Sequence, residues 1–133
     1  MRRLERCSAV ILGAALLVAG TGAGVAWAQG EWKAPADAKA MKNPVKGVGN
    51  APKTVETNCV TCHGPKGKGD GVAAVALPPP KPADWTSAKV QSETDGELFW
   101  KISNGRGAMP PWKSLPEKDR WEVVNYIRTL KGK

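Results

Sequence analysis

The sequence predicts a small all-α domain in which three to four helices are joined by long loops. The 133 residues include 15 Gly and 11 Pro, so long regular elements cannot fill the chain. One Tyr and one Phe, with no dense run of β-branched residues, argue against a β-sandwich or a β-barrel. Two stretches combine a helix-capping pattern with apolar residues at helical spacing, which favours helices.

The N-terminal segment is predicted to be an export signal. Three arginines among the first six residues precede an uncharged run, residues 7–28, whose strongly apolar part is residues 9–19. Ala26 and Ala28 match the small-x-small cleavage pattern, so we expect a periplasmic mature chain that begins at Gln29. The alternative is an uncleaved membrane anchor that faces the periplasm, since the uncharged run is just long enough to span a bilayer.

After this leader we expect an arm and then one domain. Residues 29–50 show no sustained period and predict an irregular arm, with one helical turn at residues 36–42. Residues 51–133 are predicted to form the domain. Asn50 can cap a helix whose first turn contains a proline, so a helix is expected to begin here and to end near His63.

Two further helices are predicted downstream of a loop with four glycines at residues 64–71. Residues 94–97, Thr-Asp-Gly-Glu, form a capping box before apolar residues at helical spacing. Residues 114–117, Ser-Leu-Pro-Glu, form a second capping box, and Gly132 is expected to end the helix that follows. That helix has an apolar stripe, with one aromatic beside it: Val123, Ile127, Leu130 and Tyr126.

The residues that carry chemistry are Cys59-Val60-Thr61-Cys62-His63, the attachment signature of a c-type haem. Positions three apart share one face of a helical turn, so the thiols of Cys59 and Cys62 can each form a thioether with one vinyl group of the same porphyrin. The imidazole of His63 then projects towards the iron as the proximal ligand. The predicted cofactor is therefore one covalent haem c, and its attachment outside the cytoplasm agrees with export.

Three other interpretations of this motif are weaker. A structural zinc site needs about four protein ligands, whereas the chain after the leader offers two Cys and one His in adjacent positions. A thioredoxin-like dithiol requires a βαβ context, which the sequence does not predict. A plain disulfide leaves His63 and the glycine-rich loop unexplained.

Met109 is the predicted second iron ligand. With one His in the chain, bis-His ligation within one chain is excluded. Met109 follows His63 by 46 residues, in a loop at residues 104–112 where two glycines allow close backbone approach and Pro110 favours an extended Met109 backbone. The alternative is that Met109 only packs, as Met residues often do. Met41, in the arm, is a far weaker candidate.

Several of these segments together resemble the class I c-type cytochromes, and most closely the small bacterial mono-haem members. The resemblance covers about residues 43–131. It is carried by residues 59–71 (Cys-Val-Thr-Cys-His-Gly-Pro-Lys-Gly-Lys-Gly-Asp-Gly), by residues 105–110 and by the C-terminal residues 121–130. It implies a cytochrome c-like fold in which three to four helices pack around one covalently attached haem.

The resemblance also implies that the first and last helices cross. In the family a small residue on the first helix meets an aromatic residue on the last, and Ala51 and Tyr126 match those positions. Many members carry a second aromatic where this chain has Val55, so looser packing is expected at the crossing.

Further haem contacts follow from the resemblance and from the loops. The family supports the proximal imidazole through a proline carbonyl, and Pro78 or Pro79 is expected in that role, with the register left open by three consecutive prolines. Trp85 is expected either to donate its N–H to a haem propionate or to lie in the core. Arg106 is either a propionate partner or a solvated loop residue.

The predicted function is electron transfer without catalysis, because iron with both axial positions filled has no room for a substrate. The carrier would serve a respiratory or dehydrogenase chain. The alternatives are a cytochrome c subunit of a larger membrane or periplasmic oxidoreductase and, less favoured, a haem enzyme or gas-binding protein with a displaceable sixth ligand.

The charge of the chain bears on its partners. Without residues 1–28 the chain has 17 Lys and Arg against 11 Asp and Glu, a net charge of +6. We expect a monomer that meets redox partner proteins with acidic docking surfaces. Nucleic acid is a poor alternative for an exported protein without a clustered basic motif. The basic residues of the loops that the family fold places around the haem are Lys66, Lys68, Lys81, Arg106 and Lys113.

Overall fold

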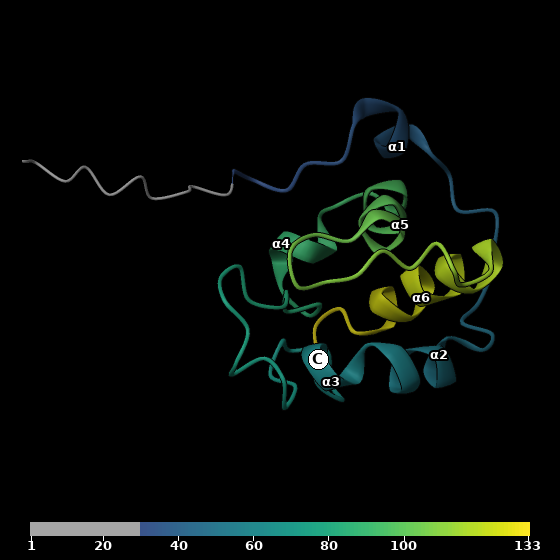
Figure 1. The fold of residues 1–133 in the computed structure, drawn as a ribbon. Coiled ribbons are helices and arrows are strands. Elements are labelled where there is room, and N and C mark those ends of the chain that lie inside the picture. Colours follow the sequence, from purple (N-terminus) through teal and green to yellow (C-terminus); the bar gives the residue numbers. More distant parts are fainter. Residues whose placement is uncertain (1–29) are drawn as a thin grey trace, which may run out of the picture.

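The computed structural model describes residues 30–133, which form an all-helical fold (Figure 1). The helices are α1 (Ala36–Ala40), α2 (Ala51–Asn58), α3 (Val60–His63), α4 (Ala88–Gln91), α5 (Asp95–Asn104) and α6 (Glu117–Thr129). No strand occurs within residues 30–133, where extended pairing is limited to one bridge between Arg106 and Met109. The predicted all-α class is confirmed: the sequence predicts the three longer helices, and single turns of four or five residues add to them.

The predicted leader at residues 1–28 and the cleavage site before Gln29 lie outside the described residues. Between residues 30 and 133, no helix combines the length and the apolar character needed to cross a membrane.

The helices pack in an order that places α6 at the centre. Helix α6 contacts α2 on one side and α5 on the other, and α5 in turn contacts α1 (Figure 1). Phe99 of α5 stacks on Trp121 of α6, with ring centroids 3.8 Å apart and planes inclined by 10°. Apolar residues of α2, α5 and α6 form one core cluster together with Trp85, Val90 and Leu130.

A buried carboxylate joins the start of α2 to α6. The backbone N–H of Asn50 donates to Glu122 Oε2 at 2.8 Å, and Lys118 also donates to this carboxylate. The side chain of Asn50 forms no cap, so the predicted Asn cap is wrong; the Glu122 carboxylate instead accepts from the backbone N–H of Asn50 itself. Gly49 is required beside it, because a Cβ there would lie 2.1 Å from Glu122 Oε1.

The crossing of the first and last helices is present, as the resemblance implies. Ala51 and Val55 are 0% and 2% exposed, so both are buried at the crossing, and the looser packing expected at Val55 stays a prediction. Tyr126 is half-buried against the core, and the fully buried aromatic of α6 is Trp121.

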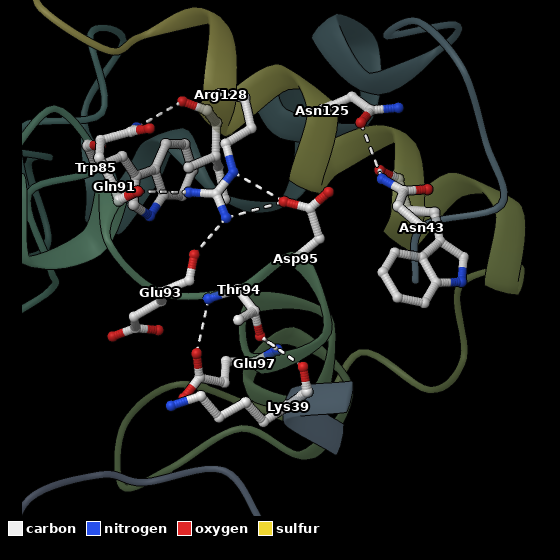
Figure 2. A network of polar contacts seen from close by, with 12 residues as sticks. Lys39, Asn43, Trp85, Gln91, Glu93, Thr94, Asp95, Glu97, Asn125 and Arg128 are labelled. Carbon is white, nitrogen blue, oxygen red and sulfur yellow. Dashed lines mark hydrogen bonds and ion pairs between the residues drawn. The ribbon is translucent and has the colours of Figure 1, made fainter. Parts of the chain in front are cut away.

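The two predicted capping boxes have different outcomes. At α5 the Thr94 side chain accepts from the Glu97 N–H, and the Glu97 carboxylate accepts from the Thr94 N–H (Figure 2). At α6 the box does not form, because Pro116 occupies the N-cap position and Ser114 lies two residues outside it. Helix α4, which the sequence analysis missed, is capped by Ser87.

The arm of residues 30–50 is docked on the helices. Asn43 Nδ2 donates to Asn125 Oδ1 of α6 at 2.8 Å, and Thr94 Oγ1 donates to the Lys39 carbonyl at 3.1 Å (Figure 2). Ala38 of α1 is 3% exposed against α5, where Gly96 leaves room for its carbonyl: a Cβ on Gly96 would lie 2.0 Å from it.

Arg128, near the end of α6, bonds to the end of α4 and to the start of α5. Arg128 Nε donates to Asp95 Oδ1 at 2.9 Å, and the two terminal nitrogens donate to the carbonyls of Gln91 and Glu93 (Figure 2). Such charge-assisted bonds fix the end of α6 against the start of α5.

Candidate functional site

The motif residues lie where α2 gives way to α3. The helix expected to run on to His63 is interrupted at Cys59, whose φ of −120° and ψ of −35° leave the regular helical conformation. The chain turns again at once, since the N–H groups of Cys62 and His63 both donate to the Cys59 carbonyl, at 3.1 Å and 2.9 Å. Cys59, Cys62 and His63 therefore still share one turn.

Both motif thiols are free. Burial, and to a lesser extent the neighbouring Cys62, raises the pKa of Cys59 to about 11. The free Cys59 thiol is therefore protonated at neutral pH. Among residues 30–133 there is no group of three or more His, Cys, Asp or Glu side chains placed to hold a metal ion.

The imidazole of His63 is held on one of its two nitrogens. Nδ1 lies 3.1 Å from the Ala83 carbonyl, and the ring stacks on Trp85 with centroids 4.4 Å apart. Burial lowers the pKa of His63 and outweighs the Ala83 hydrogen bond, which acts to raise it. The lowered pKa favours the neutral imidazole. A neutral ring that donates from Nδ1 keeps the lone pair of Nε2 for a metal.

The acceptor for His63 corrects the prediction of Pro78 or Pro79. A carbonyl supports the ring as expected, but in this structure it belongs to Ala83. The cause is the register of the segment that follows: the Trp85 N–H donates to the Gly67 carbonyl at 2.7 Å, which fixes Ala83 opposite His63.

The glycine-rich loop packs its backbone against the motif. The Gly71 N–H donates to the Cys62 carbonyl at 3.1 Å, and the Ala73 N–H donates to the Thr61 carbonyl at 2.9 Å. A Cβ on Gly71 would lie 2.4 Å from the Thr61 oxygen, and one on Gly69 would lie 2.3 Å from the Pro82 oxygen. The glycines are thus needed for close approach, on one side to the motif and on the other to the segment that meets His63.

Trp85 is 7% exposed and lies in the core, against the ring of His63. Its carbonyl accepts from Gln91 Nε2 at 2.7 Å. This is the core position that the sequence analysis allowed, and donation to a propionate stays a prediction.

Met109 lies in a tight turn. The N–H of Arg106 donates to the Met109 carbonyl at 2.9 Å, and the N–H of Met109 donates to the Arg106 carbonyl at 3.0 Å. Gly105 allows the turn to close, because a Cβ there would lie 2.4 Å from the Met109 oxygen. The Met109 side chain is half-buried against the same core cluster as Cys59.

The loop cations fall into two groups. Lys66, Lys68 and Lys113 are exposed. Lys81 Nζ donates to the carbonyls of Ala74, Val75 and Leu77, at 2.9, 3.1 and 2.7 Å, so its charge serves to fix the loop. The Arg106 side chain is also engaged: Nη2 donates to the Gly30 carbonyl at 2.7 Å.

The family is settled by comparison with known proteins. A family model described as "Cytochrome C oxidase, cbb3-type, subunit III" matches residues 48–127, more than half of the chain. The chain belongs to this cytochrome c family. A search of curated proteins gave no significant match.

Two solved structures share the cytochrome c fold. The first, "Kuenenia stuttgartiensis reducing HAO-like protein complex Kustc0457/Kustc0458", is 25% identical with a TM-score of 0.59, covering 68% of this chain and 46% of that one. This cytochrome therefore spans less than half the length of that relative. The second, "KustC0563 c-type cytochrome", is 23% identical with a TM-score of 0.52, covering 61% of this chain and 96% of that one.

Membership of the family has direct consequences. A cytochrome c domain implies a covalent haem c, and the spacing of Cys59 and Cys62 is consistent with it. Such a domain is typically an electron carrier, is usually extracytoplasmic and exchanges electrons with redox partners. The free thiols and the carbonyl-supported His63 fit this group.

Proposed function

We propose that this chain is an exported carrier of single electrons in a respiratory or dehydrogenase chain. One haem c is held by thioethers to Cys59 and Cys62, with His63 and Met109 as iron ligands. Residues 51–133 are the haem domain, residues 29–50 its arm and residues 1–28 a cleaved signal peptide. The observation that carries the proposal is the single turn that presents two free thiols and an imidazole supported on Nδ1.

Each protein group has a defined task in this proposal. The haem supplies a one-electron ferric–ferrous couple. His63 keeps a fixed ring orientation through Ala83 and Trp85. The Met109 thioether raises the reduction potential relative to a bis-His site and closes the sixth position to substrates. The buried core around both segments limits the rearrangement that accompanies electron transfer.

The test is the absorption spectrum of the purified oxidised protein, together with its mass after denaturation. We expect one covalently bound haem and the weak long-wavelength sulfur-to-iron band of Met ligation. A mature mass without haem contradicts the attachment. A spectrum without the sulfur band contradicts Met109 ligation, and ready binding of carbon monoxide then favours the gas-binding alternative.

A second candidate is a cytochrome c subunit of a larger oxidoreductase. The matched family is described as an oxidase subunit, and the relative from Kuenenia stuttgartiensis belongs to a complex. Purification from native membranes and periplasm distinguishes the two: a free carrier elutes alone, whereas a subunit elutes with its complex.

A further inference from the structure

The arm meets the Met109 turn through one aromatic ring. The Trp32 ring faces two cations: Lys101 Nζ lies 5.4 Å from its centroid and Arg106 Cζ lies 6.0 Å from it. Beside it, Arg106 Nη2 donates to the Gly30 carbonyl at 2.7 Å. We call these four residues, Gly30, Trp32, Lys101 and Arg106, the Trp32 clamp.

The clamp rests on a fixed support. Lys101 belongs to the last turn of α5 and pairs with Glu93 at 2.6 Å, and the two side chains are 16% and 18% exposed. Helix α1 follows Trp32 closely and ends at Ala40. Its residue Ala38 is buried, and the helix packs against α5. The arm is therefore attached at the clamp as well as at α1 and at Asn43, and one of the two cations that Trp32 meets, Lys101, is itself held by Glu93.

Arg106 connects the clamp to Met109. Its side chain is held by the arm, and its backbone exchanges both hydrogen bonds with Met109. The turn contains glycines with positive φ, 64° at Gly105 and 59° at Gly107, and glycine is the residue type with the greatest backbone freedom once the turn's two hydrogen bonds break and it swings out. The contacts of the Arg106 side chain oppose that motion.

We propose that the Trp32 clamp positions Met109, holding the turn closed so that the thioether stays directed at the haem iron. The inference rests on the proposed function, in which Met109 is the iron ligand. Trp32 touches neither iron nor haem in this role and acts through Arg106. It gives the arm a function in the redox site.

The test compares Trp32→Ala, Trp32→Phe and the control Lys33→Ala in the haem-loaded mature chain. Lys33 is an exposed neighbour whose side chain pairs with Glu31 at 3.0 Å, outside the clamp. For Trp32→Ala we expect hydrogen exchange at the Arg106 and Met109 amides to rise about tenfold, the size of effect that two cation–π contacts support. Cyanide binding to the ferric protein should accelerate by a similar factor.

The controls separate positioning from general stability. Trp32→Phe keeps a ring and should restore most of the slow exchange, and Lys33→Ala should match wild type. Arg106→Gln, which leaves the sequence of the arm unchanged and removes the guanidinium bond to the Gly30 carbonyl, should reproduce the effect of Trp32→Ala. Exchange and cyanide binding that stay at wild-type rates in both Trp32→Ala and Arg106→Gln overturn the clamp.

Failure of the Trp32 clamp can be told apart from failure of the proposed function. If the wild-type protein lacks the sulfur-to-iron band, the assignment of Met109 as ligand fails, whatever the exchange rates are. If wild type shows the band and Trp32→Ala keeps both the band and slow exchange, the ligand assignment stands and the clamp fails.

Discussion

The segment that carries His63 and the segment that carries Met109 are held by different means. Around His63, successive backbone bonds join the motif turn to the glycine loop, and that loop to the chain at Trp85. Around Met109, the turn is closed by its own two hydrogen bonds with Arg106, and the Trp112 N–H ties its end to the Ile102 carbonyl at 3.1 Å.

The difference indicates which of the two segments can be displaced more easily. Moving His63 means breaking contacts between several segments at once, because glycines allow those backbones to touch. Moving Met109 means opening one short turn. We therefore expect changes on the His63 side to act on folding and assembly, and changes on the Met109 side to act on ligation with the fold retained.

The largest effect is expected from Gly71→Ala. A Cβ there would lie 2.4 Å from the Thr61 oxygen and 2.6 Å from the Cys62 carbonyl carbon, both backbone atoms of the motif. Overpacking typically costs about 1–3 kcal/mol, and clashes with backbone lie at the upper end of that range. We expect little haem-loaded protein, measured as the yield of covalent haem per polypeptide. Gly30→Ala, with open space around its Cβ, is the control, and equal yields for the two variants would contradict the close approach.

The next effect is expected from Met109→Ala. The side chain is half-buried, so the loss of stability should be about 2 kcal/mol or less. The sulfur-to-iron band should vanish, the reduction potential should fall, and the ferric protein should bind cyanide readily. His63→Ala should instead impair assembly. A Met109→Ala protein that keeps a low-spin spectrum and its potential would identify another residue as the ligand.

Charge reversal of exposed lysines tests whether the partner docks beside the His63 segment or beside the Met109 segment. If acidic redox partners dock beside the glycine loop, Lys66→Glu with Lys68→Glu should slow association about tenfold at low salt, while Lys113→Glu near the Met109 turn has less effect. The spectrum and potential should stay unchanged. Stopped-flow electron transfer at several salt concentrations measures this, and rates indifferent to salt and to all three changes would indicate an apolar or permanent contact.

The smallest effect is expected at the crossing of α2 and α6, which leads into the His63 segment. Hydrogen bonds from Lys118, and next from the Asn50 N–H, hold the pKa of Glu122 below its usual range. A depressed folded pKa means that its stabilisation is complete above the unfolded pKa, about 4.3, and is lost as the pH falls through the folded pKa. Glu122→Gln should therefore be less stable than wild type at neutral pH.

Urea unfolding at a series of pH values measures the difference. The gap between Glu122→Gln and wild type should close in acid, below the folded pKa of Glu122. A difference in stability that is the same at neutral and acidic pH would assign the effect to packing and not to the ionised carboxylate of Glu122.

The sequence predicted what depends on neighbours along the chain. The capping box at Thr94 lies wholly within four residues and forms as expected. The all-α class and the motif turn also follow from local patterns, whereas the crossing of α2 and α6 was expected only from the family resemblance. The second box failed for a local reason that the pattern ignores, since Pro116 takes the cap position and begins α6 at Glu117.

Contacts between distant segments were not predictable from such patterns. Nothing near His63 in sequence identifies Ala83 as its acceptor, because that pairing depends on how the glycine loop folds back. Nor does the arm's composition reveal that Trp32 reaches Lys101 and Arg106. The four glycines of the loop were the available signal for close approach, and the sequence analysis noted them without assigning their partners.

The position of the chain's end has a consequence for how the protein is made. Just after α6, Leu130 lies against the glycine loop that follows α3, so close that a Cβ on Gly67 would come within 2.9 Å of the Leu130 side chain. In the exported carrier proposed above, with the N-terminus leading, the motif would cross the membrane well before Leu130. In that proposal the thiols would become available for haem attachment before the last helix follows, and α6 would close the fold afterwards.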